Sequence, residues 1–430
     1  MVRSGSVWPR AKPSCRCPIT RLAFAYGGSV VTAQRVTIER LVAGGDALAH
    51  LEDGRVVFVE GALPGEVVDV EITQSKKDFA RASLTSIVTP SAHRVEPPCP
   101  NVARGCGGCS WQHLDHDRHA RTKIDLVTEA LRRTAHLEGI EVGFGGSLPP
   151  SASRTTLRMA VDENGRLGFR KSHSHDIVGI EDCLVAHPLL VDLLADARVE
   201  GASEVTMRCG VASGERGVWL HDDKGRDAKG ATITGIPREV KIGRRAVVHE
   251  TVHGVNLQIS MPAFFQTSAI AAELLVNAVN TAAGDDALSG DFGPIVDAYG
   301  GGGLFSATLV DTDVEIVLVE SNKSACNDAH VNLADHTVRI EQIAVEQWNP
   351  IEAGLVIADP ARNGLGRVGA EAIVATEAPR IVLVSCDAVA GARDIRLLMD
   401  AGYTCESVTV LDLFPHTPHV EVVTALSRAR

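Results

Sequence analysis

Two residues near the carboxyl end of the chain, Cys386 and Glu421, stand in segments that indicate chemistry rather than packing. Cys386 follows the apolar run of residues 381–385, and Glu421 follows the segment FPHTPHV of residues 414–420. An apolar run of that length, ending in small and polar residues, predicts a buried parallel strand. The carboxyl ends of such strands form the edge at which open α/β folds keep their active sites. A thiol nucleophile and a carboxylate base together suit the methylation of an uncharged pyrimidine carbon.

A glycine-rich segment upstream has the pattern of a nucleotide-binding loop. Residues 297–305 read DAYGGGGLF and lie between a predicted strand and a predicted helix. Glycines let the backbone approach a ligand closely, and Glu320, at the end of the next predicted strand, suits hydrogen bonds to ribose hydroxyls. The segment lacks the Lys-Ser/Thr pair of a phosphate-binding loop. A tight turn explains the glycines alone equally well, but together with Glu320 the pattern favours S-adenosylmethionine, which has a ribose and no phosphate.

Asp359 opens the segment DPARNG of residues 359–364, directly after another predicted strand. An Asp-Pro pair in this place can simply cap a turn. Because the carboxyl ends of parallel strands lie along one edge of a sheet, however, we expect Asp359 beside Glu320 and Cys386. We therefore assign Asp359 to the predicted site.

Four of the ten cysteines form a candidate metal centre. Cys99, Cys106 and Cys109 share one glycine-rich loop, and Cys183 follows a predicted hairpin that could return it to them. Thiolates are the preferred ligands of zinc and of iron–sulfur clusters. The spacing does not separate these two metals, and unliganded buried cysteines are the alternative.

The order of elements predicts an α/β protein built from several units. Residues 36–89 contain short alternating strands with turn signals, which predict a small β-barrel of the oligonucleotide-binding type. A helical pattern follows over residues 114–137, and a second β region, over residues 154–251, opens with a hairpin. From residue 262 onward, a helix at 268–283 leads into alternating strands and helices, which imply a mostly parallel sheet. The predicted strands are residues 295–297, 315–320, 355–358, 381–385, 407–411 and 420–426.

Length and composition limit the class of protein. With 430 residues, the chain has room for about three domains. Its formal net charge of −12 argues against a surface coated in basic patches but allows a local basic groove. No stretch approaches the roughly 20 apolar residues of a membrane span, so no membrane partner is expected. We also expect the protein to be cytoplasmic and monomeric. Residues 1–33 have little periodicity and are expected to be a disordered extension.

Taken together, the motifs resemble those of the RNA uracil-C5 methyltransferase family, S-adenosylmethionine-dependent enzymes that make 5-methyluridine in 23S rRNA or tRNA. The resemblance covers nearly everything after about residue 34, and the first β unit is similar to a TRAM domain. The motifs that carry it are the CGGC loop with WQH at 111–113, FFQ at 264–266, DAYGGGGLF at 297–305, DPAR at 359–362, SCD at 385–387 and HTPHVE at 416–421.

The resemblance implies a role for each site residue and a division of the chain. Cys386 would be the nucleophile and Glu421 the base. The family's cofactor positions correspond to Gln266, Tyr299, Glu320 and Asp359. The ligands of its [4Fe–4S] cluster correspond to Cys99, Cys106, Cys109 and Cys183. The expected regions are an extension at 1–33, a TRAM-like barrel at 34–92, a central iron–sulfur and β-rich RNA-binding domain at 93–255 with the helix at 114–137, and a Rossmann-like class I methyltransferase domain at 256–430.

Three hypotheses about the function remain open, two of which differ in the substrate. By the resemblance alone, the combination of barrel and cluster implies 23S rRNA as the substrate, with a uridine of the tRNA T-loop as the alternative. A catalytically impaired RNA-binding homologue is the third, because Asp387-Ala388 stands where Asn-Pro is common and Leu304 where Asn is frequent. The presence of both Cys386 and Glu421 argues against this third hypothesis. The basic residues expected to hold RNA are Lys76, Lys77, Arg154, Arg158, Arg170 and Lys171.

Overall fold

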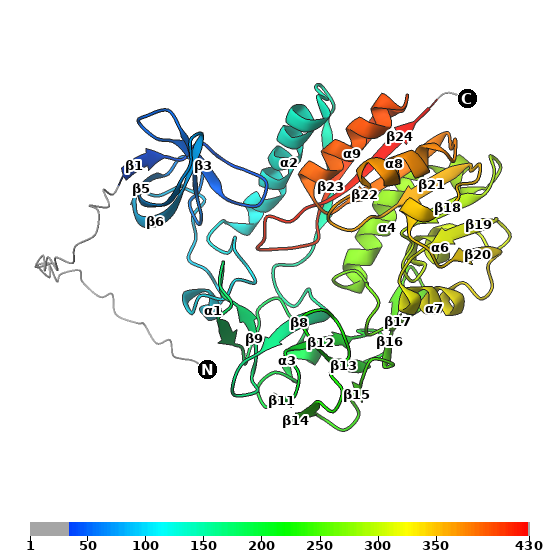
Figure 1. Ribbon diagram of the computed structural model, residues 1–430, viewed down its shortest axis with the longest axis horizontal. Coiled ribbons are helices and arrows are strands. Elements are labelled where there is room, and N and C mark those ends of the chain that lie inside the picture. The colour runs from blue at the N-terminus through cyan, green and yellow to red at the C-terminus, as the bar shows by residue number, and fades with distance from the viewer. Residues whose placement is uncertain (1–33, 429–430) are drawn as a thin grey trace, which may run out of the picture.

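The computed structural model describes residues 34–428, so the extension expected at residues 1–33 lies outside the described part. Figure 1 shows an N-terminal β unit at one end, a β-rich central region, and a large sheet covered by helices. Within the described residues, no helix is long and apolar enough to cross a membrane.

The N-terminal β unit is one six-stranded sheet in the order β1-β5-β6-β4-β3-β2, which we call the N-terminal sheet. Along β5, alternate residues such as Val68 and Val70 are fully buried, as expected for a strand with one face on a core. Trp111 and Leu126, from outside the sheet, complete that core. The strands are β1 Gln34–Thr37, β2 Arg40–Leu41, β3 Ala47–His50, β4 Val56–Val59, β5 Val67–Ser75 and β6 Phe79–Thr89.

The central region contains a second six-stranded sheet, in the order β10-β9-β8-β12-β13-β15. The hairpin expected near its start is confirmed, since Val161 pairs with Leu167 in antiparallel register. The strands are β8 Thr156–Val161, β9 Leu167–Arg170, β10 Ile177–Gly179, β12 Glu204–Cys209, β13 Arg216–His221 and β15 Lys241–Ile242. Two small sheets pair β11 Arg198–Glu200 with β14 Thr232–Thr234, and β16 Val247–Val252 with β17 Val255–Ser260. The short helices are α1 Pro100–Ala103 and α3 Pro188–Val191.

The third and largest sheet has eight strands in the order β20-β19-β18-β21-β22-β24-β23-β7. The first five of these are parallel to one another, and β24 runs antiparallel to β22. This mostly parallel sheet confirms the predicted Rossmann-like α/β fold. Its strands are β7 Val142–Ser147, β18 Ile295–Ala298, β19 Ile316–Val319, β20 Val338–Glu341, β21 Leu355–Ala358, β22 Arg380–Ser385, β23 Thr404–Asp412 and β24 Glu421–Ser427.

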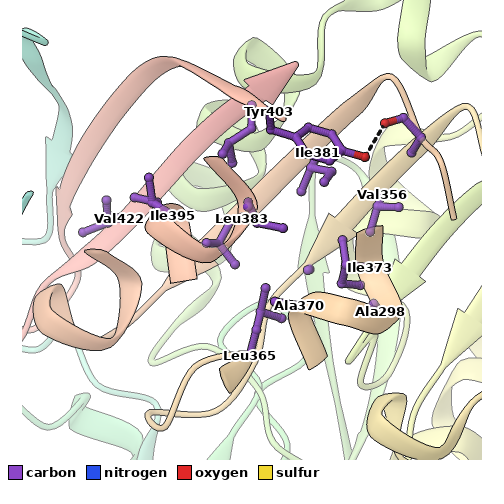
Figure 2. Packing of buried hydrophobic residues seen from close by; sticks show 14 of the residues in the cluster. Ala298, Val356, Leu365, Ala370, Ile373, Ile381, Leu383, Ile395, Tyr403 and Val422 are labelled. Carbon is purple, nitrogen blue, oxygen red and sulfur yellow. Dashed lines mark hydrogen bonds between the residues drawn. The ribbon is translucent and has the colours of Figure 1, made fainter. Parts of the chain in front are cut away.

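Helices cover both faces of this sheet, which is why its central strands are continuous apolar runs. Along β22, Ile381 and Leu383 face one cluster, and Val382 and Val384 face the other. Figure 2 shows the first cluster, in which Ile381 lies near Tyr403, and Leu383 lies near Ile395. The helices are α2 His119–Ala130 with a π turn at Leu131–Ala135, α4 Ala269–Ala283, α5 Asp285–Leu288, α6 Leu304–Leu309, α7 Lys323–Asn332, α8 Gly366–Val374 and α9 Ala388–Asp400. Short 3-10 turns are His116–Arg118 and Val345–Gln347.

Two elements within residues 93–255, the range expected for the central domain, pack with the large sheet. Strand β7 pairs with β23, and Val127 of α2 lies in the cluster on one face of the sheet. The sequence of β7, VGFGGS, gave no strand signal because glycine is depleted in strands. The elements α2 and β7 therefore connect the central region to the large sheet.

Candidate functional site

The carboxyl edge of the large sheet brings Cys386 and Glu421 together. Cys386 directly follows β22, and Glu421 is the first residue of β24. Because β24 is antiparallel to β22, with Val422 opposite Ser385, the start of β24 lies at the edge where β22 ends. Both residues line one pocket of about 560 Å³.

The four residues expected to contact a cofactor line the same pocket. They are Gln266, Tyr299, Glu320 and Asp359. Tyr299, Glu320 and Asp359 follow β18, β19 and β21, so each reaches the pocket from the carboxyl end of a parallel strand. All six site residues predicted for this pocket are thus gathered at one place.

The glycine-rich loop after β18 is held close to the sheet by its lack of side chains. A methyl group on Gly300 would lie 2.7 Å from the Leu318 side chain and 2.9 Å from the Asp297 carbonyl oxygen, so only glycine fits there. The amide of Gly301 donates to Glu320 Oε2 at 3.1 Å. Glu320 therefore fixes the loop and still presents carboxylate lone pairs to the pocket.

Three carboxyl groups lie near one another at this edge, with Asp297 and Glu421 buried and Asp359 half-buried. Burial raises the pKa of Asp297 to about 6, although Ser306 Oγ donates to it at 2.6 Å. Burial and the neighbouring Asp297 raise the pKa of Asp359 to about 7. The pKa of Glu421 is raised well above its ordinary value by burial and then by Asp359. Their mutual proximity and burial thus favour the protonated forms of these carboxyl groups relative to carboxyl groups in water.

The thiol of Cys386 is likewise kept protonated. Burial raises its pKa to about 12, and Glu421 and Asp359 add to this effect, while Arg362 opposes it. The thiolate is the nucleophilic form of cysteine, and the surroundings of Cys386 disfavour it, because burial and the two neighbouring carboxyl groups outweigh Arg362.

Arg362 and His419 also line the pocket, and neither was predicted to have a role there. Arg362 Nη2 lies 3.5 Å from His419 Nε2. Burial, and then the positive charge of Arg362, lower the pKa of His419 to about 4, so the imidazole is neutral. Both residues stand within the motifs DPAR and HTPHVE, which was the signal available in the sequence.

A buried ion pair anchors the connection between β23 and β24, residues 413–420, which we call the base loop. Lys123 Nζ of α2 donates to Asp412 Oδ1 at 2.5 Å and to the Phe414 carbonyl oxygen at 3.1 Å. The side chains of Lys123 and Asp412 are both 0% exposed. Nothing in the sequence pointed to this pair, because a lysine on an amphipathic helix is ordinarily in solvent.

The four candidate metal ligands surround one small cavity of about 40 Å³. Its lining includes Cys99, Cys106, Cys109 and Cys183. Burial raises the pKa of Cys109 to about 11, with contributions from Cys183 and Cys106, which shows that the thiols are neighbours. Among the residues described, no group of three or more His, Cys, Asp or Glu side chains is arranged to hold a metal ion. The thiols therefore share a cavity without the arrangement of a single-ion site.

Contacts between the two cysteine segments keep them together. Asn101 Nδ2 donates to the Asp182 carbonyl oxygen at 2.8 Å, next to Cys183. The Gly107 amide donates to the Arg170 carbonyl oxygen at 3.0 Å. A methyl group on Gly107 would lie 2.9 Å from that oxygen, which explains one glycine of the CGGC loop.

The basic residues expected to hold RNA have different surroundings. Arg158 and Arg170 both pair with Glu204, at 2.5 Å and 3.0 Å. Lys76 and Lys77 are exposed on the turn between β5 and β6. The others are Arg154, at the cysteine cavity, and Lys171, paired with Asp176.

Comparisons with known proteins identify relatives of this chain. The TRAM domain family matches residues 29–85. An uncharacterized RNA methyltransferase of Streptomyces avermitilis is 34% identical, over 92% of this chain and 98% of its own length. Another, of Gloeobacter violaceus, is 32% identical, over 94% of this chain and 98% of its own length.

A solved structure has the same fold. The tRNA (uracil-54, C5)-methyltransferase of Pyrococcus abyssi, in complex with S-adenosyl-L-homocysteine, matches with a TM-score of 0.70 and 24% identity. The match covers 91% of this chain and 100% of that protein. At this identity, the likeness shows the architecture.

Proposed function

This chain belongs to the family of TRAM-containing RNA methyltransferases, and on that premise we propose that it transfers a methyl group from S-adenosylmethionine to C5 of a uridine in RNA. The observation that carries the proposal is the single pocket lined by both Cys386 and Glu421 beside the glycine-rich loop. A nucleophile and a base in one cofactor pocket are what a reaction at an unreactive pyrimidine carbon requires.

Cys386 and Glu421 divide the reaction between them. The Cys386 thiolate adds to C6 of the uracil, and the electron pair of the C5–C6 double bond makes C5 nucleophilic. S-adenosylmethionine supplies the methyl group that C5 takes up. Glu421 then removes the C5 proton, the double bond re-forms, and the Cys386 sulfur leaves as thiolate. The base must leave its stack to reach both side chains.

The positive charge of the bound cofactor would favour the reactive, ionised forms of the pocket residues. The pKa values of Cys386, Glu421 and Asp359 are all raised in the free protein. An opposite charge within a few ångströms favours the ionised form of an acid. The sulfonium cation therefore favours both the thiolate of Cys386 and the carboxylate of Glu421.

The pocket edge supplies the groups that would hold the cofactor. Glu320 follows β19 and would accept the ribose hydroxyls. Gln266, Tyr299 and Asp359 line the remaining sides. The bound S-adenosyl-L-homocysteine of the Pyrococcus abyssi protein, which has the same fold, supports a related ligand here.

We include a [4Fe–4S] cluster, held by Cys99, Cys106, Cys109 and Cys183, in the proposal. Thiolates are the ligands of such clusters, and the four thiols line one cavity. Bound there, it would join the loop that contains three of the cysteines to the segment after β10.

The proposed substrate is 23S rRNA, and tRNA is the second candidate because the Pyrococcus abyssi protein of the same fold acts on uracil-54 of tRNA. The test is to digest rRNA and tRNA from a strain with and without this gene and to map 5-methyluridine by mass spectrometry. We expect one site in 23S rRNA to lose its methyl group and to regain it with the purified protein and S-adenosylmethionine. Loss from tRNA alone would select the second candidate, and an unchanged 5-methyluridine content in both RNAs would contradict uracil methylation.

A further inference from the structure

We propose that the turn at Gly44 and Gly45, between β2 and β3, positions the base loop and with it Glu421. The N-terminal sheet would then act in the chemical step, in addition to any part in holding RNA. The inference rests on the proposed function, in which Glu421 is the base.

The turn is seated directly against the base loop. A methyl group on Gly45 would lie 2.8 Å from Cγ and 2.9 Å from Cβ of Pro418, and 3.0 Å from Trp111 Nε1. The turn itself is closed by hydrogen bonds from the Gly45 amide to the Val42 carbonyl and from the Val42 amide to the Asp46 carbonyl, both 2.9 Å. Gly45 therefore packs directly against Pro418, within a turn that its own hydrogen bonds hold closed.

Trp111 joins the two surfaces. Its Nε1 donates to the Gly45 carbonyl oxygen at 3.3 Å, and its backbone amide donates to the His416 carbonyl oxygen at 2.8 Å. The side chain is 1% exposed and belongs to the core of the N-terminal sheet. A shift of this sheet would thus be passed to the base loop through a packed side chain and two hydrogen bonds.

The other contacts of the base loop come from different elements, so the turn supplies a distinct support. Lys123 holds the start of the loop at Phe414. His416 Nε2 lies 2.8 Å from the Pro150 carbonyl oxygen. Pro418, three residues before Glu421, is the part that Gly45 covers. Figure 1 shows the β23–β24 connection extending from the sheet toward α2 and the N-terminal unit.

Two neighbouring glycines provide a matched test. Gly44 has φ +93° and Gly45 has φ +96°, so alanine is strained equally at both. A methyl group on Gly44, however, meets no atom within 4 Å. Gly44→Ala therefore reports the backbone strain alone, and Gly45→Ala reports the strain plus displacement of the base loop.

We expect Gly45→Ala to lower kcat at saturating RNA by about 10- to 100-fold more than Gly44→Ala, because a misplacement of about 1 Å at a reacting group can cost about 100-fold. The Kd values of the two variants for RNA should be equal. Trp111→Phe, which removes the Nε1–H donor and keeps a ring, should lower kcat in the same direction. Equal kcat for the two alanine variants would overturn the proposal, as would a difference confined to RNA binding.

Amide hydrogen exchange separates this inference from the proposed function, because it needs no substrate. Backbone amides of residues 413–420 should exchange faster in Gly45→Ala than in Gly44→Ala, while those of β5 exchange alike in both. If the wild-type protein made no 5-methyluridine, the proposed function would fail and this measurement would still judge the contact. Equal protection of residues 413–420 in the two variants would show that Gly45 does not support the base loop, and faster exchange throughout β5 would assign the effect to the sheet itself.

Discussion

Glu421, which is buried, and Asp359, which is half-buried, line one pocket, and the pKa of Glu421 is raised by burial and by the neighbouring Asp359. Because the pKa of Asp359 is itself raised to about 7, protons are held here near neutral pH. The protein should therefore release protons when it binds S-adenosylmethionine at pH 7, since the sulfonium cation lowers the pKa values of both Asp359 and Glu421. Calorimetric titration in two buffers of different ionisation enthalpy measures the number released.

S-adenosylhomocysteine is the matched ligand for that titration because it lacks the sulfonium charge. It should release fewer protons than S-adenosylmethionine, and Asp359→Asn should reduce the difference. The same linkage fixes the pH dependence of the reaction. Glu421 acts as the carboxylate, so the single-turnover rate should fall as the pH is lowered through its raised pKa. Equal proton release by the two ligands would contradict this electrostatic account.

Glu320 should contribute to cofactor affinity through its charge. A hydrogen bond to a charged group contributes about 1.5–3 kcal/mol, so Glu320→Ala should raise the Kd for S-adenosylmethionine roughly 10- to 150-fold. Part of this loss would come from the glycine-rich loop, because the Gly301 amide donates a hydrogen bond to Glu320 that the alanine variant lacks. Glu320→Gln keeps a hydrogen-bond acceptor and loses the charge. Its Kd for S-adenosylmethionine should therefore lie between those of the wild type and Glu320→Ala. Unchanged affinity of the alanine variant by calorimetry would remove Glu320 from the cofactor site.

The four cysteines around the small cavity should give the protein a colour. Protein purified without oxygen is expected to be brown, with a broad absorbance shoulder in the visible, and to bleach when iron is removed. Cys109→Ser should lose the colour, whereas Cys405→Ser, outside the cavity, should keep it. A colourless protein with stoichiometric zinc would instead mean that these thiols bind zinc.

The buried pair of Lys123 and Asp412 should be costly to break from one side. Lys123→Met leaves a buried carboxyl group without its partner, which costs about 3–5 kcal/mol of the free energy of unfolding. The double variant with Asp412→Leu should recover most of that loss. Denaturant unfolding checks both expectations, and an equal loss in the single and double variants would show that the ion pair itself is not what is lost.

The same pair has a pH dependence of definite sign. Burial alone would raise the pKa of Asp412, but the neighbouring His119 and the charge of Lys123 lower it overall. A carboxyl group whose pKa is lower in the folded protein than in the unfolded chain stabilises the folded state at pH values above the unfolded pKa of about 3.9. This contribution is lost as the pH falls further, toward the folded pKa.

The parts of the fold that the sequence predicted are those with strong local patterns. The buried strands near Ile295, Leu355 and Ile381 are continuous apolar runs, and the observed β18, β21 and β22 match them within two residues. Strand β7 could not be predicted, since its glycines carry no strand propensity and its place depends on pairing with β23. Local pattern thus identified the core strands and missed an edge strand defined by its partner.

The site shows the same division. Cys386, Glu320 and Asp359 could be found because each follows a recognisable strand. Lys123 gave no signal, because its importance comes from a contact with Asp412, far away in the sequence. The contact of Gly45 with Pro418 was equally invisible, since it depends on how two units of the chain pack.

The covalent step at Cys386 and its release by Glu421 form the central claim. Glu421→Gln should still allow Cys386 to add to C6 and C5 to be methylated, and it should then stall because the C5 proton cannot leave. With substrate RNA and S-adenosylmethionine present, a protein–RNA adduct should accumulate and appear as a slow band on a denaturing gel. Cys386→Ala, alone or combined with Glu421→Gln, should give neither adduct nor product. A well-folded Glu421→Gln protein that turns over at the wild-type rate, or that is inactive without any adduct, would contradict the role of Glu421 as the base.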